Sequence, residues 1–414
     1  MKGGGVKESG VRPDSGLTAG GLTAGGLTAS GLMTIRRGVR IGLALVCSGA
    51  VGAAALHAAG ADAATARAGS RVAPGTILHT TLVGTAPLAV AVDARTSRAF
   101  VLASDGVNVI DTASGKSLSH VGGGVGSDPY GAGPASIAVD QTTGRVFAAN
   151  FGSGSVSMLD AGSGRLVSTT RVGAGPGAIA VDERAARVFV TNFDGDSVSV
   201  LDASNGKVLK TVSVGQAPDG VAVDTQTGYV FVANYTSNTV SVLDAKAGSF
   251  VRTVTVGIHP IDVAVDERTG RAFVANYDDS TVSVLDTTTA KVLKTVSVGV
   301  SPVSLRVYNS SGKVYVVNYT DGSVSVLDTK TLKVTNTINV GLLPSAVTID
   351  GRSGYAFVVN AGSNTVSVVD TKKGVVTRTV SVGQYPSAVA AAEANGHAFV
   401  TNEQDNNVSV LTAG

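Results

Sequence analysis

The chain has 414 residues, of which 43% are hydrophobic and only 15% are charged. This balance excludes an intrinsically disordered chain, which carries much charge and few apolar residues. Glycine accounts for 53 residues, nearly twice its usual share of roughly 7%, and indicates a folded chain with many tight turns.

The formal net charge is +2. The first 63 residues hold six Lys or Arg and three Asp or Glu, a net of +3, which leaves about −1 for residues 64–414. A near-neutral body lacks the basic footprint needed to bind nucleic acid or an anionic membrane surface. We therefore expect neither as a partner of the folded part.

The N-terminal segment reads as a targeting sequence. Residues 16–32 repeat five small residues (GLTAG) and are expected to be disordered. A basic stretch at 34–40, an apolar run at 41–59 and the small-residue site at 61–63 are typical of a secretory signal peptide. We expect residues 1–63 to be this lead and signal, 64–75 to be a linker, and the protein to be exported to the periplasm, cell surface or medium.

Two features of this segment leave alternatives open. Met33 directly precedes the basic stretch, so the chain starts at either Met1 or Met33. The apolar run is near spanning length, so a retained membrane anchor is the alternative to a cleaved signal. Cys47 is the only cysteine, and without it the mature chain has no thiol for a disulfide or a metal.

A repeat of 42 residues occupies the rest of the chain. Each unit follows the pattern V-G-x-x-P-x-x-V-A-V-D-x-x-T-G-R-x-F-V-A-N-Y, then V-S-V-L-D and T-V-x-V-G. One proline recurs in each unit, first after 47 residues and then six times after 42: Pro87, Pro134, Pro176, Pro218, Pro260, Pro302, Pro344 and Pro386.

Each unit predicts four short strands. In the fifth unit these are residues 261–266, 271–276, 282–286 and 291–298, which are rich in Val, Ile and Phe and are separated by Gly, Asn and Asp turns. Four strands per unit of about 42 residues is the size of one propeller blade. The Ser of each V-S-V segment is expected to give small-against-large packing between blades.

The ends of the repeat set the number of blades. The last unit stops after its third strand, whereas residues 77–84 before the first unit match the text of a fourth strand. We therefore predict an all-β fold in residues 76–414: a β-propeller of eight four-stranded blades, closed by the N-terminal strand completing the last blade. Seven blades, with the degenerate first unit set aside, is the alternative. If the orphan strand buries about three apolar side chains, it contributes roughly 5–9 kcal/mol.

The repeat resembles a known family. Second strands such as VFVTN (188–192), VFVAN (230–234) and AFVTN (398–402), together with V-G-x-x-P and V-S-V-L-D, are similar to the YVTN-family β-propeller repeat, also found in YncE-like proteins. The resemblance covers residues 76–412 and implies a propeller of largely secreted or surface proteins with unassigned ligands. Many relatives have seven blades, so an eighth is a departure. Two further departures from the family pattern are Ser104, which replaces the Asn at the end of the second strand, and the long loop at 121–134.

Polar residues that recur in almost every unit are interpreted as structural. The Asn residues that end the second strands and the Asp residues that end the third are expected to cap turns. The chain has no Trp, which argues against quinone-cofactor, WD-type and kelch-type propellers.

Candidate binding residues are those that break the repeat near the channel. First strands line the channel of a propeller, and channel mouths are common ligand sites. Arg306 stands where other units have a small residue, and Asp262 in the adjacent blade is its candidate partner. The proposed ligand-binding set is Arg306, Asp262, His259, Asp219, Tyr385, Gln216 and Gln384, with Tyr130 of the long loop as a further departure. The alternative for Arg306 is a solvated side chain in a wet channel.

Metal, cofactor and catalytic motifs are not evident. His79, His120, His259 and His397 are scattered, and a metal needs three or four converging ligands. Acidic loop residues are reminiscent of calcium ligands but lack a bidentate Glu at the required spacing: Asp194, Asp196, Asp278, Asp279 and Asp321. No nucleophile elbow, phosphate loop or dinucleotide fingerprint occurs. We therefore expect no metal, no cofactor and no catalytic residues.

Three functions remain. The regular units favour a non-enzymatic, exported binding or scaffold module, a monomer whose ligand is a protein or a cell-wall glycan. The first alternative is a propeller-type hydrolase or lyase, similar to a lactonase, with its site at the channel mouth. It predicts charged residues with perturbed pKa values there. The second alternative is a cell-envelope structural protein, which predicts a large exposed apolar patch.

Overall fold

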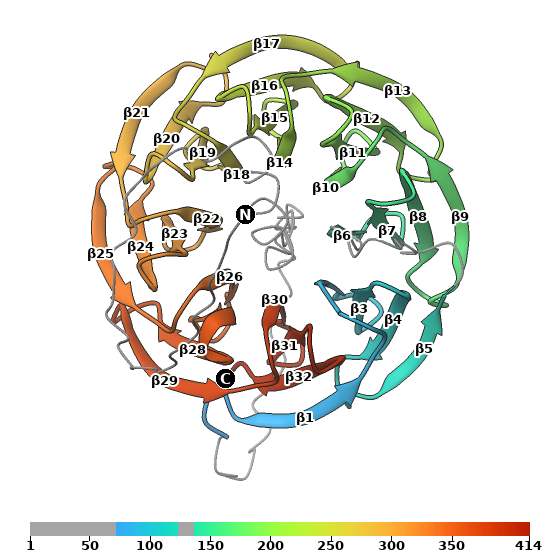
Figure 1. The fold of residues 1–414 in the computed structure, drawn as a ribbon, viewed down its shortest axis with the longest axis vertical. Helices are drawn as coiled ribbons and strands as arrows, with labels where there is room; N and C mark the ends of the chain where they lie inside the picture. The colour runs from blue at the N-terminus through green and yellow to red at the C-terminus, as the bar shows by residue number, and fades with distance from the viewer. Residues whose placement is uncertain (1–71, 123–135) are drawn as a thin grey trace, which may run out of the picture.

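The computed structural model describes residues 72–122 and 136–414. These residues form eight four-stranded antiparallel sheets arranged around a central channel (Figure 1). Eight blades confirm the prediction, and the seven-blade alternative is wrong. The predicted lead and signal segment and the part of the long loop with Tyr130 lie outside the described residues. No helix in the described ranges has the length and apolar character of a membrane span.

Each blade runs outward from the channel through four strands. The first strands, at the channel, are β2 (Ala89–Asp93), β6 (Ser136–Asp140), β10 (Pro176–Asp182), β14 (Pro218–Asp224), β18 (Pro260–Asp266), β22 (Pro302–Tyr308), β26 (Pro344–Asp350) and β30 (Pro386–Ala392). The second strands are β3 (Arg98–Ala103), β7 (Arg145–Asn150), β11 (Arg187–Asn192), β15 (Tyr229–Asn234), β19 (Arg271–Asn276), β23 (Lys313–Asn318), β27 (Tyr355–Asn360) and β31 (His397–Asn402). The third strands are β4 (Gly106–Asp111), β8 (Ser155–Asp160), β12 (Ser197–Asp202), β16 (Thr239–Asp244), β20 (Thr281–Asp286), β24 (Ser323–Asp328), β28 (Thr365–Asp370) and β32 (Asn407–Thr412).

The outermost strands form the rim of the ring. They are β5 (Ser117–Val121), β9 (Leu166–Arg171), β13 (Val208–Ser213), β17 (Ser249–Thr255), β21 (Val292–Ser297), β25 (Val334–Asn339), β29 (Val375–Ser381) and β1 (Ile77–Leu82). A short 3-10 turn, η1 (Ala361–Ser363), follows β27.

The N-terminal strand closes the ring, as predicted. The last sheet has the order β1-β32-β31-β30, and β1 runs antiparallel to β32 (Figure 1). The Gly75 N–H donates to the Thr412 carbonyl (2.8 Å), and the Thr412 N–H donates back to the Thr76 carbonyl (2.9 Å). The expectation that this strand stabilises the ring by burying about three apolar side chains is wrong, however. Leu82 is 77% exposed and Ile77 40% exposed, so the strand acts mainly through backbone hydrogen bonds.

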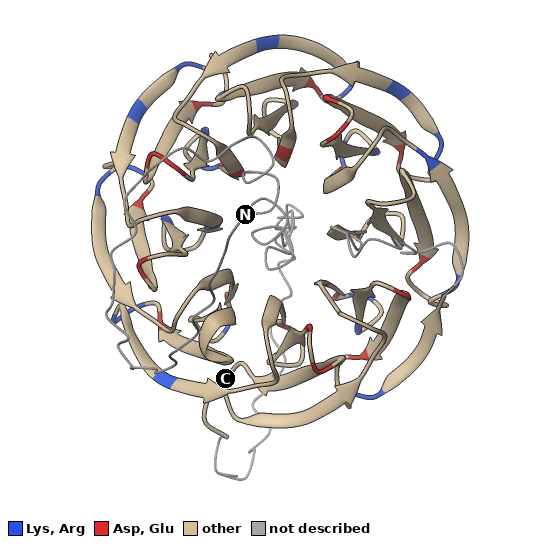
Figure 2. Ribbon diagram, in the orientation of Figure 1, with Lys and Arg blue, Asp and Glu red and all other residues tan. Residues whose placement is uncertain are grey.

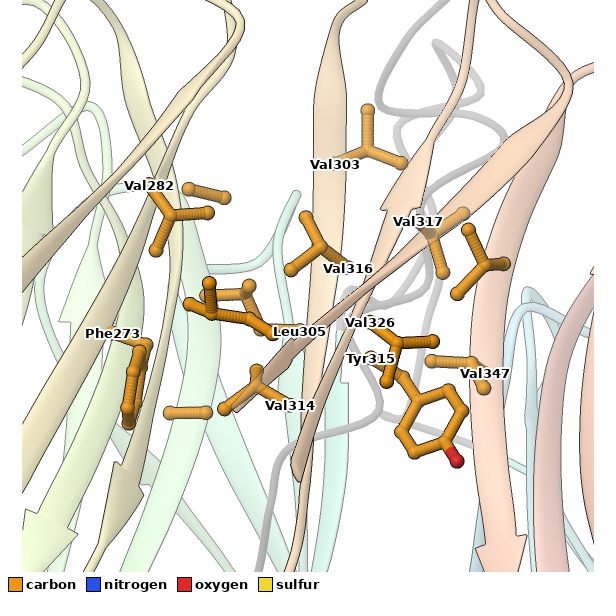
Figure 3. Close-up of a cluster of buried hydrophobic side chains, with 14 of the residues drawn as sticks. Phe273, Val282, Val303, Leu305, Val314, Tyr315, Val316, Val317, Val326 and Val347 are labelled. Carbon is orange, nitrogen blue, oxygen red and sulfur yellow. The ribbon is translucent and has the colours of Figure 1, made fainter. Parts of the chain in front are cut away.

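The hydrophobic core lies between the blades. Because side chains of a strand alternate between its two faces, a sheet packed on both sides needs apolar residues at every position. Figure 3 shows this for β23, where Val316 lies towards Leu305 and Val282 while Val317 lies on the side of Val347. One aromatic ring per blade is fully buried in the second strand: Phe100, Phe147, Phe189, Phe231, Phe273, Tyr315, Phe357 and Phe399.

The recurrent Asn residues hold the second and third strands together. The side-chain amide of Asn276 donates to the hydroxyls of Thr281 and Ser283 (both 2.9 Å). The same pair of bonds to hydroxyls recurs from Asn150, Asn192, Asn234, Asn318 and Asn360. Asn402 donates to the Ser409 hydroxyl and to the side-chain carbonyl of Asn407. The structural interpretation of these Asn residues is thus confirmed. The Ser of V-S-V accepts this amide, a role that the sequence analysis did not predict.

The glycine of V-G-x-x-P is required by the same Asn. A Cβ on Gly215 would lie 2.7 Å from the Asn234 amide carbon, well inside van der Waals contact. The equivalent glycine in other blades meets the equivalent Asn in the same way, for example Gly299 against Asn318. The repeat therefore conserves a buried polar contact as well as an apolar pattern.

Candidate functional site

The first strands enclose a cavity of about 430 Å³ inside the channel. Ala91, Ala138, Ala222, Ala264 and Ala390 line it from equivalent positions of five blades. Arg306 and Thr348 occupy the same position in the sixth and seventh blades. Arg306 therefore places a fixed positive charge in a wall made mostly of methyl groups.

One carboxyl group interacts with this arginine, and a second carboxyl group interacts with the first. Asp262 on β18 interacts electrostatically with Arg306 on β22 and with Asp219 on β14. These three strands belong to neighbouring blades, so the cluster spans three successive walls of the channel. The main-chain N–H of Leu305 donates to Asp262 Oδ2, and that of Val263 donates to Oδ1 (both 2.8 Å). These bonds fix the orientation of the carboxyl group.

Gly220 allows β14 and β18 to approach each other at this point. A Cβ on Gly220 would lie 2.8 Å from the Cα of Asp262. Any side chain at position 220 would therefore push the two strands apart. The close approach brings Asp219 and Asp262 into one electrostatic cluster.

Burial raises the pKa of Asp262 to about 7, even though two backbone hydrogen bonds and the Arg306 charge act to lower it. Asp219 adds a like charge that also raises this pKa. The residue as a whole is partly exposed, whereas desolvation of the carboxyl group is the largest cause of the shift. At neutral pH it can therefore both accept and donate a proton, which is the property that a general acid–base residue needs.

The three glutamates that line the cavity, Glu183, Glu267 and Glu393, have structural roles. Glu183 Oε1 accepts the Gln141 N–H and Glu267 Oε1 accepts the Thr225 N–H (both 2.8 Å). Glu393 Oε1 accepts the Gly351 N–H (3.0 Å). Each of these glutamates caps the turn of the preceding blade, and so we do not assign it to the site.

The remaining candidates lie on the loops that precede the first strands, at the end of the channel where the recurrent prolines stand. The His259 ring stacks on Tyr235 with centroids 4.3 Å apart, and His259 Nδ1 contacts Asp278 Oδ2. Gln216 and Gln384 are exposed loop residues. Burial raises the pKa of Tyr385, which precedes Pro386. The structure thus brings Asp219, Asp262 and Arg306 into one electrostatic cluster. Of the seven candidates only Arg306 lines the cavity of about 430 Å³.

Two residues with altered surroundings were not among the candidates. Burial raises the pKa of Glu403 to about 7. Tyr308 lines the cavity at the end of β22. Glu403 stands where Tyr235, Tyr277 and Tyr319 stand in other blades, and this departure from the repeat is the signal that could have identified it.

The acidic loop residues bind backbone amides. Asp196 Oδ1 accepts the Ala217 N–H of the next blade (2.8 Å). Asp279 and Asp321 each accept an N–H (2.6 Å) from the loop that precedes the first strand of their own blade. Within the described residues, no three His, Cys, Asp or Glu side chains are grouped so that they could hold a metal ion.

The raised pKa of Asp262 predicts a pH-dependent stability. Because its pKa is about 7 in the folded chain against an ordinary 3.8, the native state binds more protons than the unfolded state between these values, and the stability falls as the pH rises from about 4 to 7. The expected loss is about 2–4 kcal/mol, since one pKa unit is worth about 1.4 kcal/mol. Urea unfolding at both ends of this range should show this loss in the wild type but not in Asp262→Asn. Glu403, whose pKa is also raised, is present in both the wild type and the variant, so its contribution cancels when the two pH dependences are compared. Parallel pH dependences would contradict the shift.

Comparison with known proteins gives the fold alone. No protein-family model matches the chain, and no curated protein sequence matches it. Among solved structures, the Kuenenia stuttgartiensis hydrazine synthase is similar with a TM-score of 0.57 and 20% identity, covering 67% of this chain and 95% of that one. The dihydro-heme d1 dehydrogenase NirN in complex with DHE has a TM-score of 0.60 and 16% identity, covering 79% of this chain and 69% of that one.

These similarities correct one expectation. The regularity of the blades led to the prediction that the chain is not an enzyme, yet both similar structures are named as enzymes. The physical reason is that regular blades leave the channel wall free to vary. Here three departures from the repeat, Asp219, Asp262 and Arg306, are enough to create an asymmetric charged cluster.

Proposed function

We propose that the chain is a propeller-type enzyme of the hydrolase or lyase class, which acts on a small substrate in the channel. The observation that carries the proposal is the Asp262 carboxyl, with a pKa of about 7, beside the Arg306 guanidinium in the channel wall. Asp262 would transfer the proton, and Arg306 would bind the negative charge of the substrate or of the intermediate. The cavity of about 430 Å³ has the size of a small-molecule site.

Hydrolysis of a lactone is the reaction that these two groups support most simply. The Asp262 carboxylate takes a proton from water while the water oxygen attacks the lactone carbonyl carbon. The carbonyl electrons move to its oxygen, where Arg306 stabilises the negative charge. When the carbonyl re-forms, the ring C–O bond breaks and Asp262 returns the proton to the departing alkoxide. The product is a hydroxy acid.

The full chain should be assayed against a panel of γ- and δ-lactones by proton release. The same preparation should be assayed against short uronate oligosaccharides for the ultraviolet absorbance of the conjugated elimination product. We expect turnover in one of these two assays above the level of an Asp262→Asn preparation. Rates equal to that preparation in both assays would refute the proposal.

Family and location are part of the same proposal. The second-strand pattern VFVAN and its variants support membership of the YVTN-type repeat proteins. The basic stretch at 34–40 followed by the apolar run at 41–59 supports export through a signal segment. A lactonase or lyase in that location would act on substrates outside the cytoplasm.

A further inference from the structure

One face of the ring exposes apolar side chains on adjacent loops. We call it the loop face, formed by the loops that precede the first strands and those that follow the second strands. Ile258, Val300, Leu342 and Leu343 are exposed there on three successive loops, with Leu342 66% exposed. Large apolar side chains that are exposed on neighbouring loops of one face are typical of interaction surfaces.

Aromatic side chains belong to the same face, on the loops that follow the second strands. Tyr235 stacks on His259, and Ser301 hydrogen-bonds the Tyr277 hydroxyl. Tyr319 interacts electrostatically with Tyr277 and with Tyr385. All of these tyrosines are only partly buried. Tyrosine is enriched at protein interfaces because its ring packs and its hydroxyl forms hydrogen bonds.

The charge on the loop face has one sign. Among the described residues of these loops there are eight carboxylates: Asp105, Asp194, Asp196, Asp278, Asp279, Asp321, Glu403 and Asp405. The same loops contain no Lys or Arg in the described ranges. Figure 2 shows basic residues on outer strands such as β13, β17 and β21. Most other described Lys and Arg residues lie at the turns on the opposite face of the ring, which join first to second strands and third to fourth strands. Arg306 lies in the channel.

The apolar loops and the negative charge together select the occupant. We propose that the loop face binds a basic polypeptide segment that carries apolar side chains between its Lys or Arg residues. Apolar residues of the partner would pack on Leu342 and Val300, and its cations would meet Asp279, Asp321 and the tyrosine rings. An anionic lipid surface would be repelled by the same carboxylates. The inference does not depend on the channel chemistry, because it uses different residues at the end of the channel.

The test measures binding of the full chain to a fluorescent peptide of alternating Lys and Leu residues by anisotropy. The matched probe has Glu in place of Lys. We expect saturable binding of the Lys peptide at low salt, loss of binding as the salt concentration rises to about 0.5 M, and no binding of the Glu peptide. Equal binding of the two peptides, or no binding of either, would overturn the proposal.

Paired variants locate the site. The double substitution Val300→Ser with Leu342→Ser should weaken binding about tenfold or more, because interface energy is concentrated in a few residues. Leu209→Ser with Leu293→Ser, at comparably exposed positions on the outer strands, is the control and should leave the affinity unchanged. If the two double variants bind equally, the loop face is not the binding surface.

Discussion

Deletion of residues 72–84 is expected to remove most of the stability of the protein. The deletion takes away β1 and leaves the backbone of β32 unpaired along its outer edge. The ladder has five residue pairs, and a net contribution of about 1 kcal/mol per hydrogen bond gives a loss of the order of 5 kcal/mol. A typical domain has a net stability of only about 5–15 kcal/mol. The freed edge would also pair with other chains and favour aggregation.

Urea unfolding and light scattering measure both effects. Thr412→Val is a milder test of the same contact, since it removes the hydroxyl that accepts the Thr76 N–H (3.0 Å) and donates to the Ala73 carbonyl (2.7 Å). It should cost about 1–2 kcal/mol. Leu82→Ser, at a side chain that is 77% exposed, is the control and should change the stability little. A truncated chain as stable and as monodisperse as the wild type would show that the ring does not depend on β1.

Replacement of Arg306 by Ala is expected to lower kcat/KM about 100-fold or more on the substrate found by the panel. Loss of a single charge-stabilising donor from an active site has an effect of this size. The substitution also removes a positive charge that lowers the pKa of Asp262. The rise of kcat/KM with pH should therefore move to higher pH, a change that a purely structural role would not produce.

Arg306→Lys keeps the charge and should restore part of the activity, although not the planar two-donor geometry of the guanidinium. Arg171→Ala is the matched control, because Arg171 is exposed on the outer strand β9. The thermal melting point should be recorded for all three variants. An Arg306→Ala enzyme with wild-type kcat/KM and an unchanged pH profile would exclude Arg306 from the chemistry.

The strands of the blades are predicted well by the sequence. The expected second strand of the fifth unit, 271–276, matches β19 residue for residue, and the expected 261–266 differs from β18 by one residue. The reason is that every unit repeats the same buried apolar positions and turn residues. The exposed character of Leu82 was not foreseen, because an outer strand of a blade has no neighbouring sheet that must cover its side chains.

The candidate site is predicted only in part. Arg306 and Asp262 stand out because they break the repeat within a first strand. His259 and Tyr385 break it equally but lie on loops, and departure from a repeat does not say which end of the channel a residue occupies. The structure also has a register shift between Pro260 and Asp262. Because such a shift changes which side chains face the channel, the pairing of Asp219 with Asp262 could not be derived from strand alternation.

The pH dependence of kcat/KM tests the proton-transfer role of Asp262 most directly. For wild-type enzyme acting on a lactone we expect kcat/KM to rise with pH and to level off above an apparent pKa of about 7, because the carboxylate is the active form. Asp262→Asn should lose about 100-fold or more and show no such rise, while Asp194→Asn, at an exposed loop residue, should keep the wild-type profile. A wild-type profile that is flat between pH 5 and 9 (about two units on either side of that pKa), or one retained by Asp262→Asn, would contradict a channel enzyme that works through this aspartate.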